Sequence, residues 1–133
     1  MNEQQFLDRI IHLATVQRWA IHHDRPARRA GARWATAIQG HAGFPDLVLA
    51  RQGVVLFREV KGYQASGRLG RLSSEQLDWA RQLDHWATRS IIDVGSGLSA
   101  IEARRTMLFD VWTPDDWDTL IVPTLTARAA RSA

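Results

Sequence analysis

The feature that most constrains the fold is a pair of apolar segments, 47–50 and 54–61, joined by Arg51-Gln52-Gly53. Two apolar segments separated by a short turn that contains glycine predict a β-hairpin. If glutamine and glycine alone form the turn, the register carried back along the hairpin sets Asp46 opposite Glu59. A three-residue turn would shift the pairing by one residue and make that contact diagonal, but still within reach.

Two carboxylates that face each other repel, so the hairpin predicts that something compensates their charge. A divalent cation does so, because Mg²⁺ accepts one or two carboxylates and retains several waters. Lys61 lies two residues after Glu59 and shares its strand face. An ammonium group there could orient or help deprotonate an attacking water, or stabilise charge developing on a phosphate. The alternative is that Asp46 ends a turn and that Glu59 and Lys61 form an exposed strand pair.

Lys61 is the only lysine of the chain, and the other 16 of its 17 basic residues are arginine. A GC-rich genome could explain the excess of arginine. The exception is informative, because a lysine ammonium is compact and its pKa shifts readily on burial. The net charge of +3 and the pI of about 10.5 favour an anionic partner such as nucleic acid, although a merely basic domain would show the same balance.

Taken together, these segments resemble the PD-(D/E)xK nuclease superfamily, and more closely its VRR-type nuclease domains. The resemblance spans nearly the whole chain. The matching segments are Glu3, His22-His23, Gly43-Phe44-Pro45-Asp46-Leu47, Glu59-Val60-Lys61, Leu72-Ser73-Ser74-Glu75-Gln76 and Val111-Trp112-Thr113-Pro114-Asp115-Asp116-Trp117. Two segments, 62–71 and 86–107, look longer than in such domains, which bears on substrate shape and oligomer contacts more than on chemistry.

The resemblance implies an α/β fold with a restriction-endonuclease-like core, in which helices flank a mixed β-sheet. It also implies a Mg²⁺ or Mn²⁺ cofactor and hydrolysis of DNA phosphodiesters. By position, Asp46 and Glu59 look like metal ligands, with the Val60 carbonyl as a third, and Lys61 looks like the catalytic lysine. Stand-alone members of this family are similar to small homodimeric nucleases that act on branched DNA such as four-way junctions.

The resemblance also adds Glu3 and Gln76 to the catalytic set, but each has a structural alternative. Glu3 could simply be an acid that the dipole favours in a first helical turn. Gln76 could form a capping box with Ser73. The pair His22-His23 is ambiguous between a structural role and a DNA or metal-site role, and neighbouring strand residues face opposite ways.

The best candidates for phosphate contacts are arginines in two glycine-containing connections. Such contacts position a nucleic acid without reading its sequence, whereas the alternative is a solvated loop. The candidate residues are Arg25, Arg28, Arg29, Arg33, Arg68 and Arg71.

Periodicity and capping signals predict one domain over residues 1–126, with a disordered tail at 127–133. The predicted helices are 3–18, capped by Asn2, then 73–87, 99–105 and a last short helix opened by Thr113-Pro114. The predicted strands are 19–23, 47–50, 54–61, 91–94 and 107–112, with an extended stretch at 34–38.

Several classes of protein are excluded or disfavoured by composition. The chain has no cysteine, which excludes disulfides and thiolate metal sites. It shows no apolar run of membrane-spanning length and no signal peptide, so we expect a cytoplasmic protein of a bacterium or a phage-infected host, without a membrane partner. The competing hypotheses are a non-cleaving nucleic-acid-binding module and a nuclease subunit that needs a partner for targeting.

Overall fold

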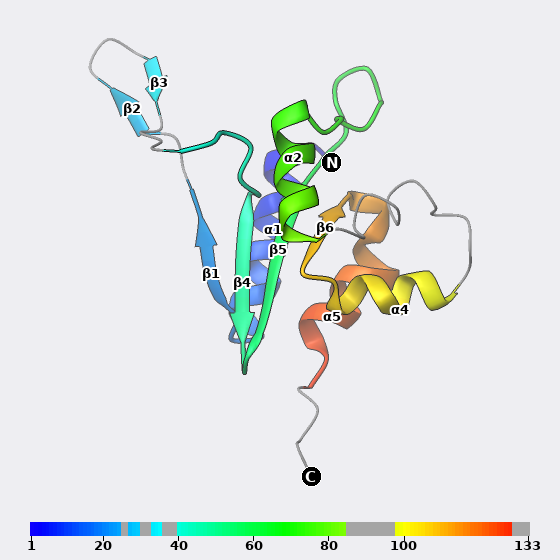
Figure 1. The fold of residues 1–133 in the computed structure, drawn as a ribbon. Coiled ribbons are helices and arrows are strands. Elements are labelled where there is room, and N and C mark those ends of the chain that lie inside the picture. The colour runs from blue at the N-terminus through cyan, green and yellow to red at the C-terminus, as the bar shows by residue number, and fades with distance from the viewer. Residues whose placement is uncertain (25–26, 30–32, 36–39, 85–97, 129–133) are drawn as a thin grey trace.

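The computed structural model describes residues 1–24, 27–29, 33–35, 40–84 and 98–128 (Figure 1). Within these ranges one helix is followed by five strands, then by two helices, a sixth strand and a short helical segment. In order they are α1 (Glu3–Val16), β1 (Ala20–His23), β2 (Ala27–Arg29), β3 (Arg33–Ala35), β4 (Leu47–Arg51), β5 (Val54–Val60), α2 (Ser74–Leu83), α4 (Leu98–Thr106), β6 (Phe109–Trp112), a 3₁₀ turn (Pro114–Asp116), a π-helical turn (Trp117–Ile121) and α5 (Val122–Thr126).

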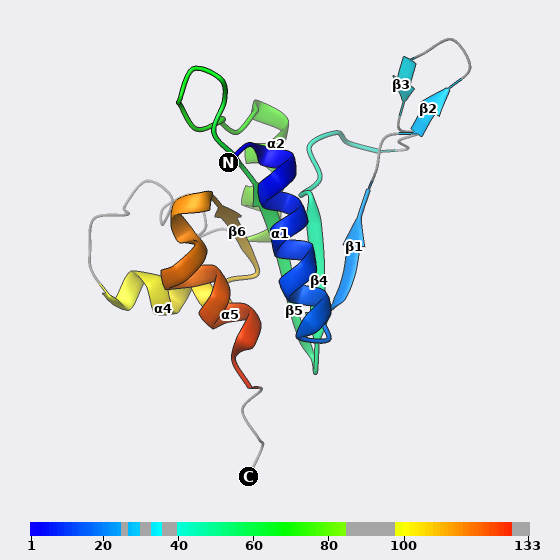
Figure 2. The same ribbon diagram turned by 180° about the vertical axis from the view of Figure 1, so that it is seen from behind.

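Four of the strands form one mixed sheet in the order β1-β4-β5-β6. The pairs β1–β4 and β4–β5 are antiparallel, whereas β5 and β6 are parallel. Helix α2 crosses one face of this sheet, and α1 covers the other (Figures 1 and 2). The predicted α/β class, a mixed sheet flanked by helices, is therefore confirmed.

Each face of the sheet is closed by its own apolar cluster. The larger cluster packs α1 and the C-terminal helices against β4, β5 and β6, with Phe6, Ile10, Leu49, Leu56 and Trp112 at its centre. The smaller one lies under α2 and joins buried Ala80 and Phe109 to the partly buried Phe57, Leu83, Met107 and Val111. Strand β5 is held from both sides, which fixes the position of the residues at its end.

Of the two registers that the sequence allowed for the β4–β5 hairpin, the structure has the one with a two-residue turn, with Arg51 paired to Val54 and Leu47 paired to Arg58. Gln52 and Gly53 adopt φ angles of 50° and 83°. Positive φ at both central residues is the mark of a type I′ turn, whose twist matches that of the flanking strands. The turn thus dictates that Asp46, just before β4, lies beside Glu59.

The predicted helix ends need small corrections. Helix α1 starts as predicted with Asn2 as N-cap in a capping box, but it ends at Val16 because Arg18 adopts a φ of 64°. Helix α2 ends at Leu83, earlier than predicted, since Asp84 is extended. The last predicted helix is instead a 3₁₀ turn, a π-helical turn and α5 in succession.

Other predicted elements are confirmed in part. The helix predicted at 99–105 is α4, and the strand predicted at 107–112 is β6, which begins two residues later. The extended stretch predicted at 34–38 overlaps β3, which pairs with β2 in a separate two-stranded sheet that projects from the body (Figure 1). Residues 91–94, most of 34–38 and most of the predicted tail 127–133 lie outside the described residues. Within the described ranges, every helix is too short or too polar to cross a bilayer.

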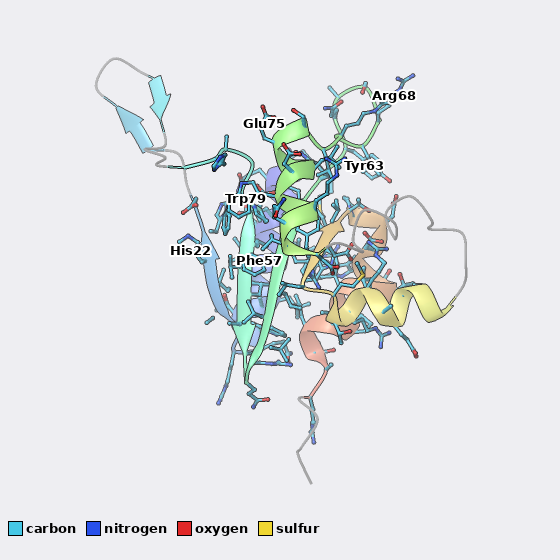
Figure 3. The ribbon with its side chains drawn as sticks, in the orientation of Figure 1. His22, Phe57, Tyr63, Arg68, Glu75 and Trp79 are labelled. Atoms are coloured by element: carbon cyan, nitrogen blue, oxygen red, sulfur yellow. The ribbon has the colours of Figure 1, made fainter. Side chains whose placement is uncertain are left out.

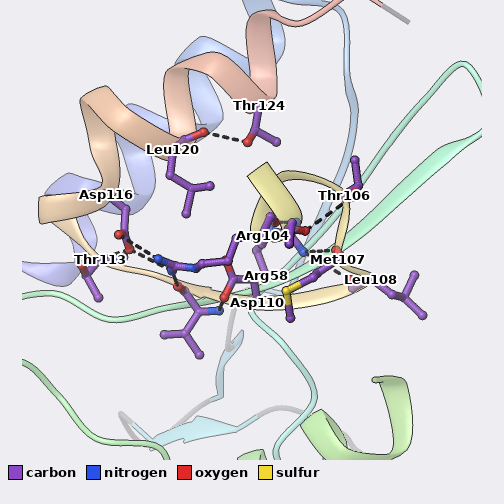
Figure 4. A network of polar contacts seen from close by, with 12 residues as sticks. Arg58, Arg104, Thr106, Met107, Leu108, Asp110, Thr113, Asp116, Leu120 and Thr124 are labelled. Carbon is purple, nitrogen blue, oxygen red and sulfur yellow. Dashed lines mark hydrogen bonds and ion pairs between the residues drawn. The ribbon is translucent and has the colours of Figure 1, made fainter. Parts of the chain in front are cut away.

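A buried polar network behind β5, which the sequence did not predict, ties the last third of the chain to the sheet (Figure 4). Arg58 is completely buried and donates to the carbonyls of Met107 at 3.0 Å and Leu108 at 3.2 Å. Burial lowers the pKa of Arg58 to about 10, an effect that the nearby Asp110 carboxylate opposes. Arg104 bridges Asp110 at 3.0 Å and Asp116 at 3.3 Å. Burial also raises the pKa of Asp110, against the charge of Arg104.

Removing one partner of this network leaves buried charge without compensation. We expect Asp110→Ala to lower the free energy of unfolding by about 3–5 kcal/mol, the usual range for breaking a buried pair. Glu102→Ala, at an exposed position of neighbouring α4, is the control and should change it by less than about 0.5 kcal/mol. Urea denaturation at neutral pH measures both, and equal effects of the two variants would contradict the role assigned to the network.

Candidate active site

The carboxylate of Asp46 is fixed where β4 begins. Its Oδ2 accepts a hydrogen bond from the backbone N–H of Val60 at 2.8 Å, across the end of the hairpin. Its own backbone carbonyl lies 3.0 Å from Nδ1 of His23, on the neighbouring strand β1. Side chain and main chain of Asp46 are thus both held by strands of the sheet.

Glu59 lies at the end of β5 and is only 2% exposed. Its Oε1 accepts a hydrogen bond from Nε2 of Gln76 at 2.8 Å and lies 3.6 Å from Nζ of Lys61. Burial, then the charge of Asp46 and a hydrogen bond with it, raise the pKa of Glu59 to about 9, although Lys61 acts in the opposite direction. The predicted pair of adjacent carboxylates is therefore present, and the raised pKa shows that ionising both carboxylates at once is unfavourable.

Lys61 follows β5 directly, and its side chain is 14% exposed. The loop after it folds back over its stem. The Gly70 N–H donates to the Gly62 carbonyl at 3.2 Å, and a Cβ at Gly70 would come within 3.3 Å of the Lys61 Cδ. The 62–71 connection thus folds back over the stem of the only lysine, whose ammonium lies beside Glu59.

The first turn of α1 reaches the same place. A Cβ on Gly62 would lie 2.3 Å from the backbone nitrogen of Glu3, so only glycine allows this close approach. Burial and the charge of Asp46 raise the pKa of Glu3, while Lys61 lowers it. Glu3 is therefore both a first-turn acid and a neighbour of the carboxylate pair, and the two interpretations of the sequence are compatible.

Gln76 also combines the two roles between which the sequence could not choose. Its Oε1 accepts from the Ser73 N–H at 2.8 Å in a capping box, and its Nε2 donates to Glu59. Gly43, with a φ of +95°, permits the loop before Asp46 to touch this helix start, where a Cβ would be 2.5 Å from the Glu75 carbonyl carbon. The N-terminus of α2 therefore packs directly against the site.

The two histidines diverge as strand alternation requires. His23 contacts Asp46, whereas Nε2 of His22 lies 2.9 Å from Asp24 in an exposed pair. The contact of His23 with Asp46 was not predicted, because it depends on the pairing of β1 with β4, which could not be read from the sequence.

The predicted phosphate-binding arginines are only partly placed. Arg68 and Arg71 are exposed on the loop between β5 and α2, and Arg68 extends beyond the end of the sheet that carries the site (Figure 3). Arg28, Arg29 and Arg33 belong to β2 and β3, and Arg25 lies outside the described residues.

The chemistry of the donor set fits a hard divalent cation. The buried carboxylate of Glu59 and the half-buried carboxylate of Asp46 lie together with unfavourable mutual charge, which Mg²⁺ or Mn²⁺ would relieve. Val60, between Glu59 and Lys61, could add its carbonyl. Among the described residues, no group of three or more histidine, aspartate or glutamate side chains is arranged as a metal site. A cation here would therefore depend on Asp46, Glu59, backbone and water.

Comparisons of the chain with protein-family models, with curated proteins and with solved structures gave no match. The chemistry of this site therefore rests on its own geometry.

The raised pKa of Glu59 predicts how stability depends on pH without metal. With its pKa near 9, the Glu59 carboxyl stays protonated in the folded protein over most of the range below pH 9, whereas in the unfolded chain it ionises near its ordinary pKa of 4.5. The contribution of Glu59 to the free energy of unfolding is therefore full below pH 4.5, and it is lost as the pH rises from 4.5 to about 9. Melting temperatures in EDTA from pH 5 to 9 should fall more for the native protein than for Glu59→Gln. Glu102→Gln, at an exposed position, should behave like the native protein, and parallel curves for all three would contradict the assignment.

Proposed function

We propose that the protein is a metal-dependent nuclease that hydrolyses DNA phosphodiester bonds, built on a restriction-endonuclease-like core of the VRR type. One observation carries this proposal. Asp46 and Glu59 converge at the end of the hairpin, and the only lysine of the chain lies 3.6 Å from the Glu59 carboxylate. The buried Glu59 beside the half-buried Asp46 and a covered ammonium is poorly explained as an exposed strand pair, and a bound cation would relieve the unfavourable charge of the two carboxylates.

In this proposal Asp46 and Glu59 hold Mg²⁺ or Mn²⁺, with the Val60 carbonyl as a further ligand. The ion, when bound, would activate water and polarise the phosphate. The chain's own residues supply orientation. The Val60 N–H and His23 hold Asp46, and Gln76 holds Glu59.

Lys61 is the residue proposed to act on the reacting groups. Its stem is held under Gly70, so its ammonium stays beside the carboxylates rather than in solvent. From there it can position the attacking water or stabilise negative charge on the phosphate. Glu3 adds negative charge at the same place, which increases the demand for a cation.

The proposed substrate is DNA, with branched forms such as four-way junctions as the candidates, and the proposed assembly is a homodimer. The support is the net charge of +3 and the two exposed arginines, Arg68 and Arg71, on the loop next to Lys61. Contacts of this kind bind phosphates without selecting a sequence. The segment with Arg25, Arg28, Arg29 and Arg33 is proposed to act in the same way.

Cleavage assays test the proposal directly. Labelled linear, flapped and four-way DNA are incubated with Mg²⁺, Mn²⁺ or EDTA. We expect cleavage only with metal, and a loss of about 10²–10⁴-fold in rate for Lys61→Ala, the range typical of a positioned acid–base group. Arg128→Ala, an exposed position near the other end of the molecule, should retain full activity. Cleavage that survives EDTA or Lys61→Ala would refute the mechanism, and metal-independent binding without cleavage would favour a binding module.

His23 should matter through Asp46 rather than by touching the substrate. We expect His23→Ala to weaken Mn²⁺ binding by about 10–100-fold, as loss of a residue that orients a ligand typically does. His22→Ala removes the neighbouring, exposed histidine and should leave Mn²⁺ affinity unchanged. Titration calorimetry measures both, with circular dichroism to confirm folding, and equal affinities for the two variants would show that His23 does not position Asp46.

A further inference from the structure

A groove opens beside the site along α2, and the nuclease chemistry makes no use of it. It has a volume of about 680 Å³ and lies between α2 and the loop that leads to Asp46. This volume is within the range of pockets that bind small organic groups. The lining residues are Gly40, His41 and Ala42 from the loop, and Glu75, Asp78, Trp79 and Gln82 from α2.

The indole of Trp79 forms part of the wall of this groove, and two contacts fix its orientation. Its Nε1 donates to the carbonyl of His41 at 3.2 Å. The ring of Phe44 meets it edge-on, with centroids 5.1 Å apart and planes at 88°, and Phe44 in turn packs against Phe57. Figure 3 shows Trp79 on the side of α2 that faces β4. An aromatic ring fixed in this way is a ready surface on which a flat ring can stack.

The carboxylates of the groove disfavour a phosphate and favour a group that carries N–H donors. Glu75 and Asp78 supply carboxylate oxygens, and Gln82 supplies an amide. One oxygen of each carboxylate has a partner outside the groove lining, since Asp78 Oδ1 accepts from Arg81 at 3.2 Å and Glu75 Oε2 accepts from the Ser74 hydroxyl at 3.2 Å, and the other oxygen is available to a ligand. Among the described residues that line the groove there is no lysine or arginine. Carboxylates accept hydrogen bonds from exocyclic amino groups of bases, such as N4 of cytosine. Thymine has no amino group and would find fewer partners.

The groove is adjacent to the site where a phosphodiester would be cut. Glu75 immediately precedes Gln76, whose amide is bonded to Glu59, and Trp79 follows Gln76 by three residues on the same helix. Because α2 rises about 1.5 Å per residue, Trp79 and Gln76 are separated by less than one turn. A nucleotide with its phosphate at Asp46 and Glu59 would have its base beside this groove.

We propose that the groove binds an unpaired, amino-bearing nucleobase of the substrate strand, next to the scissile phosphate. The base stacks on Trp79 and donates its amino group to Asp78 or Glu75. A paired base cannot do this, because its amino group and its stacking faces are engaged in the duplex. The proposal rests on the proposed nuclease function, and it assigns a substrate class to it: DNA with an unpaired nucleotide at the cut, as in a flap or an open junction.

Nuclear magnetic resonance of the ¹⁵N-labelled indoles tests the groove without any cleavage. The Trp79 signal is assigned with Trp79→Phe, and the native protein is titrated with dCMP, dTMP and 2-deoxyribose 5-phosphate. We expect dCMP to shift the Trp79 signal and to bind at least about fivefold tighter than dTMP, the lower limit for one good base contact. The sugar phosphate should leave this signal in place.

Two variants test the groove without removing its aromatic wall. Ala42→Phe should fill it and abolish the response to dCMP. Asp78→Asn should reduce the preference for dCMP over dTMP, while Asp118→Asn, at an exposed position outside the groove, should retain it. Equal shifts with all three ligands, or an unchanged response in Ala42→Phe, would overturn the proposal. So would a response confined to a peptide of residues 25–33, which would identify the groove as a site for a basic segment.

Failure of the groove and failure of the nuclease can be told apart. A protein that cleaves flapped DNA but gives no Trp79 response to dCMP retains the nuclease assignment and refutes the groove. A protein that binds dCMP at Trp79 yet cleaves no DNA retains a nucleobase site, and it refutes both the nuclease and the position of the groove beside a scissile bond.

Discussion

The placement of two carboxylates side by side at the open end of a β-hairpin is the constraint on which the site depends. A type I′ turn fixes the register of β4 and β5, and that register brings Asp46 against Glu59. Burial of Glu59, and then the charge of Asp46, raise the pKa of Glu59. The surrounding contacts, from the Val60 N–H, Gln76 and Lys61, each offset part of this unfavourable charge.

The rest of the fold holds that arrangement rigid. Strand β5 is packed on both faces, by the α1 cluster and by the α2 cluster. Two glycines, Gly43 and Gly62, let the loop before β4 and the end of β5 press against the first turns of α2 and α1. Behind β5, Arg58 ties the strand to the carbonyls that precede β6. Moving the two carboxylates apart would therefore require several packed elements to shift together.

The sequence predicts the parts of this arrangement that depend on neighbours along the chain. The hairpin register follows from the Gln52-Gly53 turn, and the N-cap role of Asn2 and the capping box of Ser73 with Gln76 were both predicted. The box that Asn2 forms with Gln5 was not predicted, although it has the same spacing. The residues along the chain predicted the capping role of Gln76. Its hydrogen bond to Glu59 could not be derived from them, because it depends on how α2 crosses the sheet. The same reason hid the contact of His23 with Asp46, which requires the β1–β4 pairing.

Arg58 shows most clearly what the sequence did not yield. It lies inside the motif that carries the site, yet it faces the opposite side of β5, where its neighbours Leu56 and Val60 are buried. Strand alternation was the available signal for its burial. Its partners, the carbonyls of residues 107 and 108, come from almost fifty positions later and could not be named in advance.

The central claim is that a divalent cation joins Asp46 and Glu59. Crystals of the protein soaked with Mn²⁺, measured for the anomalous scattering of manganese, test this claim most directly. The account predicts a peak bonded to both carboxylates, with the Gln76 amide still beside Glu59, and loss of the peak in Asp46→Asn. A map without a peak there, with the two carboxyl groups still hydrogen-bonded to each other, would contradict it.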